Sequence, residues 1–208
     1  MDTTHESGSL ALVSGGQTVE ELGLRAPTGF AHVLYGELAA LLERHRVALR
    51  SIDCFAAASG PGSFTGVRVG LACVKGLAEA CGKPAVAVSN LRAIAAFGSA
   101  PLRAPLIDAR RGEIYGAVYD AAGAIVVPEM VASLEVFLKS LPAADIEFLA
   151  TDFSSFQPPV NGTLVPAALA AAIGRLACEQ YAAGAASDPA ALDANYVRRS
   201  DAELFWKE

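Results

Sequence analysis

The residues that most suggest chemistry lie in a glycine-rich stretch, residues 60–66, ahead of a long apolar run. Its members are Gly60, Pro61, Gly62, Ser63, Phe64, Thr65 and Gly66. Amide groups exposed where a helix begins attract anions, so this stretch could bind a phosphate. Two departures oppose that interpretation. A Walker loop needs Lys after its last glycine, where this chain has Val67, and the third glycine falls one place late for a dinucleotide fingerprint.

A packing role explains more of the same residues. Gly66, Gly70 and Cys73 recur at helical spacing, which predicts a helix face of small residues that another stretch of backbone can approach closely. Arg68 and Lys75 fall on another face, which we expect to meet water or a partner. The pattern therefore favours a tightly packed helix with an exposed interface side over a phosphate site.

A second charged group combines Asp108, Arg110, Arg111 and Glu113 between two apolar runs. An acid beside a pair of arginines could bind a phosphate or a carboxylate, because the guanidinium fork suits both. The simpler interpretation is a polar hairpin turn with internal salt bridges. Both remain open at this stage.

The other chemically capable residues form no recognisable catalytic set. The three histidines lack HxxxH spacing, no GxSxG motif is present, and the four cysteines lack CxxC spacing. We expect the cysteines to be reduced thiols and the chain to carry no metal or other cofactor. The segment from Tyr196 to Lys207 places aromatic beside basic residues, which favours docking on the body over contact with RNA.

Composition limits the class of protein. The 208 residues are 53% hydrophobic and 18% charged with a net charge of −6, which argues against a disordered chain and against an autonomous nucleic-acid binder. No apolar run is long enough to span a membrane, and the polar start is not a signal peptide. We therefore expect a cytoplasmic α/β protein.

The elements that would position these residues follow from hydrophobic spacing. We expect a hairpin at residues 9–14 and 17–24, strands at 51–58 and 84–88, and helices at 31–46, 64–81 and 89–96. A strand should also precede Asp2, so we expect a few apolar residues ahead of Met1. A turn-rich boundary at 97–101 divides the chain into lobes at 1–100 and 101–208. The second lobe should contain strands at 104–108, 113–119, 124–127 and 146–150, with helices at 131–141 and 166–183.

The stretch from Ser59 to Ala78, SGPGSFTGVRVGLACVKGLA, resembles the signature of the TsaB (YeaZ) family. The resemblance extends to Asp2-Thr3-Thr4, His32, the stretch from Ile107 to Tyr115, and the terminal Asn195–Arg198 with Ala202-Glu203. It implies the two-lobed fold of actin, Hsp70 and sugar kinases, which is ribonuclease H-like.

The resemblance also implies a function. TsaB proteins are non-catalytic subunits that bind TsaD, form homodimers when alone, and meet TsaE through the complex with TsaD. That complex transfers a threonylcarbamoyl group to N6 of adenosine 37 in tRNAs that read ANN codons, so tRNA would be met only indirectly. By this interpretation the partner surface comprises His32, Leu34, Leu38, Leu41, Arg68, Gly70 and Lys75.

Departures from an actin-like ATPase support a subunit without its own activity. Asp2 is followed by Thr-Thr-His rather than by a glycine, and Thr151–Ser155 offers no glycine for a second phosphate loop. Asp2 would then belong, with Asp108, Arg110, Arg111 and Glu113, to a degenerate nucleotide site or to the interface between lobes. The alternatives are a small ATPase or kinase-like enzyme of the same fold and, with less support, a metallopeptidase.

Overall fold

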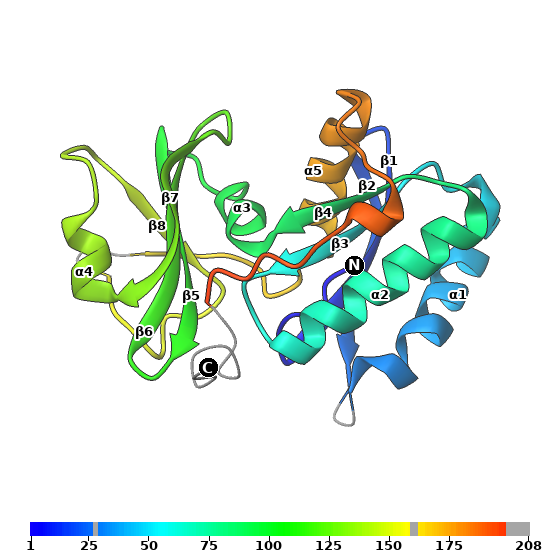
Figure 1. Cartoon of the computed structure of the whole chain (residues 1–208), viewed down its shortest axis with the longest axis horizontal. Coiled ribbons are helices and arrows are strands. Elements are labelled where there is room, and N and C mark those ends of the chain that lie inside the picture. Colours follow the sequence, from blue (N-terminus) through cyan, green and yellow to red (C-terminus); the bar gives the residue numbers. More distant parts are fainter. Residues whose placement is uncertain (27–28, 159–161, 199–208) are drawn as a thin grey trace, which may run out of the picture. The chain divides into compact units, whose positions relative to one another are not determined.

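The computed structural model describes residues 1–26, 29–158 and 162–198 (Figure 1). Its chain divides into two compact units. Unit 1 comprises Met1–Ala93 and Pro166–Ala194, and unit 2 comprises Ile94–Val165 and the chain from Asn195 onward. The chain first passes from unit 1 to unit 2 between Ala93 and Ile94, a few residues before the predicted boundary at 97–101. The units are not contiguous halves, however, because residues 166–194 return to unit 1.

The described residues of unit 1 form two small sheets and four helices. Its strands are β1 (Ser7–Ser14), β2 (Gln17–Arg25), β3 (Phe55–Gly60) and β4 (Ala85–Ser89), and its helices are α1 (Leu34–Arg44), α2 (Phe64–Cys81), α3 (Asn90–Ala95, which runs on into unit 2) and α5 (Ala170–Ala182). The short 3-10 turns are η1 (Phe30–His32), η2 (Leu49–Ser51) and η3 (Pro189–Ala191). β1 pairs with β2 in antiparallel fashion, and β3 pairs with β4 in parallel.

The predicted first hairpin is confirmed by the pairing of β1 with β2. Gly15 and Gly16 both have positive φ, 56° and 77°, as a two-residue hairpin turn requires. β3 begins later than predicted because Leu49–Ser51 forms a 3-10 turn. α5 likewise begins at Ala170 rather than at Pro166.

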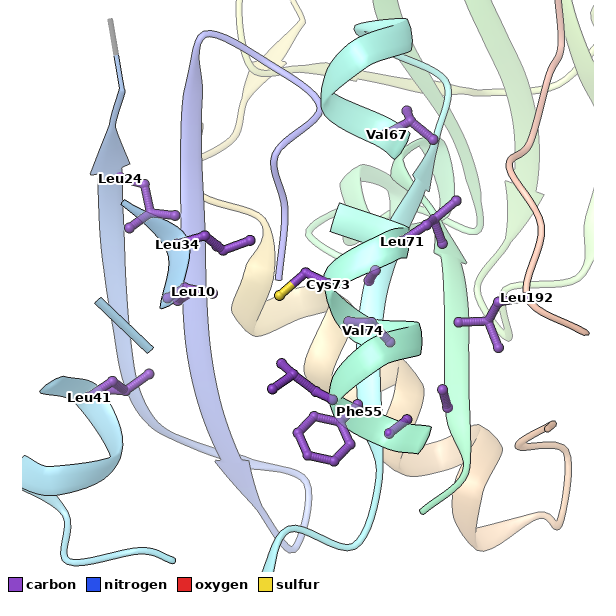
Figure 2. Packing of buried hydrophobic residues seen from close by; sticks show 14 residues of the cluster. Leu10, Leu24, Leu34, Leu41, Phe55, Val67, Leu71, Cys73, Val74 and Leu192 are labelled. Carbon is purple, nitrogen blue, oxygen red and sulfur yellow. The ribbon is translucent and has the colours of Figure 1, made fainter. Parts of the chain in front are cut away.

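α2 is defined at both ends by local signals in the sequence. The Ser63 hydroxyl accepts a hydrogen bond from the Gly66 amide at the start of the helix, and Gly82, with φ 64°, ends it. Every turn of α2 contributes side chains to the core of unit 1. Figure 2 shows Val67, Leu71, Cys73 and Val74 of this helix with residues of β1, α1 and β3.

α5 returns to unit 1 because its apolar face covers the strands. Ala172 and Ile173 are buried there. The Ser9 hydroxyl of β1 accepts hydrogen bonds from the amides of Leu169 and Ala170, which lack partners within their own helix. A helix late in the sequence is thereby attached to the first hairpin.

Unit 2 is built on a five-stranded mixed sheet in the order β7-β6-β5-β8-β9. Its strands are β5 (Leu102–Arg110), β6 (Glu113–Asp120), β7 (Ile125–Ser133), β8 (Glu147–Ala150) and β9 (Thr163–Leu164), with α4 at Leu134–Lys139. The predicted helix at 131–141 was wrong at its start, because pairing with β6 keeps the chain extended as far as Ser133. Ser133 then caps α4, whose Phe137 is fully buried in the core of this unit.

Within the part of the chain that the structure describes, no helix has the length and apolar character needed to cross a bilayer.

Candidate functional site

The glycines of α2 hold the N-terminal segment of the chain against the helix. A Cβ atom on Gly66 would lie 1.9 Å from the Thr3 carbonyl oxygen, and one on Gly70 would lie 2.7 Å from the Thr3 hydroxyl. A Cβ atom on Gly62 would similarly meet the Thr4 carbonyl oxygen at 2.7 Å. Only glycine permits such an approach, so the close backbone contact predicted for this helix face is confirmed.

Hydrogen bonds attach this segment to α2 as well. The Thr3 hydroxyl donates to the Gly66 carbonyl at 2.7 Å, and the Ser63 amide donates to the Thr4 carbonyl at 2.7 Å. With the Ser63 hydroxyl capping the helix, the glycine-rich loop therefore serves to pack the N-terminal segment. This accounts for Gly62, Gly66 and Gly70 without a phosphate.

A buried chain of polar groups continues from that contact. The Thr4 hydroxyl donates to Asp2 Oδ1 at 2.6 Å and accepts from Asn90 Nδ2 at 2.8 Å. Asn90 Oδ1 in turn accepts from the Gly60 amide at 3.0 Å. Asp2, Thr4 and Asn90 are all essentially inaccessible to water. This chain fixes three segments relative to one another: the N-terminal residues, the loop after β3 and the start of α3.

Asp2 remains a charged group in this buried setting. Burial alone would raise the pKa of its carboxyl, but His5 and the hydrogen bonds from Thr4 outweigh it and hold the pKa below its usual value. Asp2 Oδ2 lies 3.9 Å from His5 Nδ1, and neither Oδ2 nor His5 Nε2 has a hydrogen-bond partner within the described part of the chain. Among the described residues, no group of three His, Cys, Asp or Glu side chains is placed to hold a metal ion.

The partner residues predicted on α1 and α2 separate into buried and accessible sets. Leu34, Leu41 and Gly70 are buried in the core of unit 1, and Figure 2 shows Leu34 directed toward α2. Their assignment to a partner surface is corrected here. The leucine stripe on α1 faces the hydrophobic core, and Gly70 faces Thr3. Leu38 is half-buried against the same core.

The accessible predicted residues are His32, Arg68 and, in part, Lys75. Arg68 extends over the Phe64 ring, with 3.7 Å between the guanidinium carbon and the ring centroid. Such stacking holds both side chains on the exposed side of α2. Lys75 is less available, because its ammonium donates to the Ala190 carbonyl at 3.4 Å.

The sequence analysis missed two side chains of this region. Tyr35 is 57% exposed on α1. The nearby Cys73 thiol of α2 raises the pKa of the Tyr35 hydroxyl, and burial raises the pKa of Cys73. This pair links α1 to α2. Asn90 was missed too, although β3 and β4 were predicted as strands. Gly60 ends β3 and Asn90 directly follows β4. Because the two strands pair in parallel, these residues lie at the same end of the sheet.

In unit 2 the charged group forms a hairpin turn. Arg110, Arg111 and Gly112 all have positive φ between β5 and β6, and Asp108 Oδ1 accepts from the Arg110 amide at 2.7 Å. Asp108 Oδ2 also lies 3.4 Å from Arg110 Nη1. The internal salt bridge expected of a polar turn is therefore present.

Glu113, at the start of β6, pairs with a residue far along the chain. Arg198 donates to the Glu113 carboxylate and to the Ala109 carbonyl, and its guanidinium lies 5.7 Å from the Tyr115 ring centroid. The terminal Asn195–Arg198 segment thus docks on unit 2, whereas Ala202 and Glu203 lie outside the described residues. Asp2 lies in unit 1 and this hairpin lies in unit 2.

Comparison with known proteins supports this picture. The family model of TsaD, tRNA N6-adenosine threonylcarbamoyltransferase, matches residues 27–199. The tRNA threonylcarbamoyladenosine biosynthesis protein TsaB of Bacillus subtilis is 33% identical over 81% of this chain and 79% of its own length. The tRNA N6-adenosine threonylcarbamoyltransferase of Rhizobium meliloti is 46% identical over 76 residues, which are 36% of this chain and 20% of that protein.

Solved structures agree with these sequence relatives. YeaZ from Pseudomonas aeruginosa superposes with a TM-score of 0.77 at 28% identity and covers 94% of this chain and 96% of its own. An uncharacterized protein with similarity to peptidase YeaZ from Pseudomonas aeruginosa superposes with a TM-score of 0.78 at 29% identity, over 95% and 97% of the two chains.

Mixed α/β units with helices on their sheets, together with these neighbours, define a protein of the actin-like, ribonuclease H-like class. Its N-terminal residues pack on a glycine-lined helix and carry no recognisable phosphate loop. The chain belongs to the TsaB (YeaZ) family.

Proposed function

We propose that this chain is a non-catalytic subunit that binds TsaD and supports transfer of threonylcarbamoyl to N6 of adenosine 37 in ANN-decoding tRNAs. TsaB relatives carry tRNA threonylcarbamoyladenosine biosynthesis in their names, and this coarser role follows from family membership. TsaE would be met through TsaD, and tRNA only through the complex in the cytoplasm. Without TsaD the same surface would form a homodimer.

The observation that carries the proposal is the exposed face of α2. Residues four apart, Phe64, Arg68, Ala72 and Gly76, are all exposed along this helix. A large aromatic side chain and its stacked arginine occupy one end, and small residues follow. Small residues allow a second helix to approach closely, while aromatic and arginine side chains are typical anchors of protein interfaces.

α1 extends this surface beside α2 (Figure 1). Tyr35 is exposed next to Cys73 of α2, and His32 lies just ahead of α1. The buried Leu34 and Leu41 hold α1 in place from beneath. Two neighbouring helices with exposed aromatics are well suited to pack against helices of a partner, so we assign the partner surface to His32, Tyr35, Phe64, Arg68 and the small residues of α2.

We also propose that the chain has no catalytic activity of its own. Asp2 Oδ1, Thr4 and Asn90 are joined by hydrogen bonds, and Gly62 and Gly66 lie against the backbone of Thr4 and Thr3 rather than against open space. Catalytic electrostatics require groups aimed at the position where charge develops. In this interpretation the network is structural, and Asp108, Arg110, Arg111 and Glu113 stabilise a hairpin in the same way.

Binding to TsaD of the same organism tests the proposal. Gly76→Arg places a long charged side chain on the exposed stripe where a Cβ atom meets nothing within 4 Å, so the fold should be unaffected. Ala182→Arg, on the exposed end of α5, is the matched control. We expect titration calorimetry to show at least tenfold weaker binding for Gly76→Arg and wild-type binding for the control. If the unmodified chain does not bind TsaD, the proposed function is wrong. If the unmodified chain binds TsaD and Gly76→Arg binds it equally tightly, the assigned surface is wrong.

A further inference from the structure

His5 directly follows the buried segment Asp2–Thr4. Its side chain is 27% exposed, yet its Nε2 atom is shielded from water and has no hydrogen-bond partner among the described residues. The other ring nitrogen, Nδ1, lies 2.9 Å from the Thr4 hydroxyl oxygen and 3.9 Å from Asp2 Oδ2. Only the shorter of these two distances is a hydrogen bond. The His5 ring is therefore linked to Asp2 through the Thr4 hydroxyl rather than by a direct hydrogen bond.

The Thr4 hydroxyl has as many neighbours as it can bind. A hydroxyl group has one proton and two lone pairs, so one donated and two accepted hydrogen bonds satisfy it completely. Three atoms lie within range of its oxygen: Asp2 Oδ1 at 2.6 Å, Asn90 Nδ2 at 2.8 Å and His5 Nδ1 at 2.9 Å. One of these atoms receives the hydroxyl proton, and the other two must donate.

Asn90 donates to Thr4, because the orientation of its amide group is fixed at the other end. The Asn90 atom that faces the Gly60 amide nitrogen, at 3.0 Å, must be the oxygen, since a backbone N–H only donates. The atom that faces Thr4 is then the NH2 nitrogen, which is a donor. Asn90 therefore uses one of the two lone pairs of the Thr4 hydroxyl.

Asp2 receives the hydroxyl proton. Its Oδ1 accepts from the Thr4 amide at 2.8 Å and from the Thr4 hydroxyl at 2.6 Å. Burial raises the pKa of this carboxyl, but His5 and the two bonds from Thr4 outweigh burial and leave the pKa below its usual value. An ionised carboxylate only accepts hydrogen bonds. The single proton of Thr4 is thus used, and His5 Nδ1 has to donate the third bond.

We infer that His5 is a positioning residue, which keeps a proton on Nδ1 and donates it to the Thr4 hydroxyl. The assignment is the same in both protonation states of the ring. The neutral ring must be the Nδ1–H tautomer, and the imidazolium carries this proton as well. Without this donor, a buried hydroxyl oxygen would lose a partner at a point that water does not reach.

Thr4 transmits the restraint from His5 to the start of α2. The Thr4 carbonyl accepts a hydrogen bond from the Ser63 amide at 2.7 Å, and the Ser63 hydroxyl caps the helix. Phe64, the aromatic end of the proposed partner surface, is the next residue. His5 therefore helps to hold the end of α2 that TsaD would contact. The link to TsaD rests on the proposed function, whereas the Nδ1–H donor does not.

Nitrogen NMR of the wild-type chain with isotope-labelled histidine tests the proton assignment without any mutation. When the ring is neutral, the proton–nitrogen correlations of His5 should show a protonated Nδ1 and an unprotonated Nε2. The exposed His32 provides the reference spectrum of a solvated ring, and His5→Asn identifies the His5 signals by their loss. A neutral His5 ring with its proton on Nε2 overturns the inference.

His5→Asn and His5→Leu form a matched pair of variants. The two side chains have similar size and shape, but only asparagine can donate from the position of Nδ1. We expect the Ser63 and Gly60 amides to exchange about tenfold faster in His5→Leu and at the wild-type rate in His5→Asn. Equal exchange rates in the two variants contradict the inference. If His5→Leu does not fold, faster exchange in His5→Asn is the contradicting result.

Titration with TsaD separates this inference from the proposed function. We expect His5→Leu to bind TsaD about threefold more weakly than the wild-type chain and His5→Asn to bind it equally tightly. If the wild-type chain does not bind TsaD, the proposed function is wrong, and the spectrum and the exchange rates decide the role of His5. If the wild-type chain and both variants bind equally tightly, His5 does not position the partner surface.

Discussion

Gly66→Ala is the most direct probe of the contact between α2 and the N-terminal segment. The new Cβ atom would lie 1.9 Å from the Thr3 carbonyl oxygen, whereas real contacts are not shorter than about 3.0 Å, so backbone must move by about 1 Å. Overpacking of this kind costs about 1–3 kcal/mol, with the upper end expected because backbone must move. Movement also breaks the hydrogen bond from Thr3 to the Gly66 carbonyl, at about 1 kcal/mol.

The helix itself would gain from alanine, which offsets part of this loss by about 1 kcal/mol. We therefore expect Gly66→Ala to lower the free energy of unfolding by about 3 kcal/mol. For a chain of this size that corresponds to a Tm lower by about 6–12 °C.

Gly76→Ala is the matched control on the same helix. Its Cβ atom meets nothing within 4 Å, so the helix gain stands alone and Tm should rise by about 2–4 °C. Calorimetric melting of the three proteins decides the question. If Gly66→Ala melts at or above the wild-type temperature, the N-terminal segment does not pack on α2 as described.

Three further predictions concern buried or paired groups. Asn90→Ala leaves buried polar partners without hydrogen bonds and should lower unfolding free energy by about 2–4 kcal/mol in urea titrations, while an unchanged midpoint would contradict the buried network. The Met1 amine has its pKa lowered to about 6 by burial, against Asp2 and Glu21, so the unfolded chain binds more protons between pH 6 and 8. The free energy of unfolding should therefore fall by up to about 3 kcal/mol as pH drops through that window, and a stability that does not change with pH there would contradict burial of this amine. Arg198→Met should lower the free energy of unfolding by no more than about 1 kcal/mol in urea titrations, since the Glu113 carboxylate that Arg198 pairs with is half-exposed. A loss above about 3 kcal/mol would contradict this weak role of the ion pair.

Local signals were sufficient to predict much of the fold. The Gly15-Gly16 turn and the Gly82 stop each act within a few residues, so the first hairpin and the end of α2 followed from sequence alone, whereas the Ser63 cap was not predicted. The return of α5 to unit 1 did not, because it depends on contacts between Ser9 and Leu169, residues that only the folded chain brings together.

The site was predictable to a similar degree. The small face of α2 could be read from glycine spacing, but its contact, Thr3, lies 63 residues away. Leu34 and Leu41 were assigned to a partner because an apolar stripe looks the same whether it faces a core or another protein. Asn90 carries no local motif, and its role arises from the parallel pairing of β3 with β4.

Reconstituted tRNA modification tests the central claim most directly. TsaD and TsaE, together with TsaC, the enzyme that by the family resemblance makes the threonylcarbamoyl-adenylate donor, would be assayed on unmodified tRNA with threonine, bicarbonate and ATP, with and without this chain. We predict modification near background when the chain is omitted, restoration by the wild-type chain and by Asp2→Asn, and failure of Gly76→Arg. An Asp2→Asn chain that folds and binds TsaD but restores nothing would contradict the account, because the Asp2 carboxylate would then take part in the chemistry.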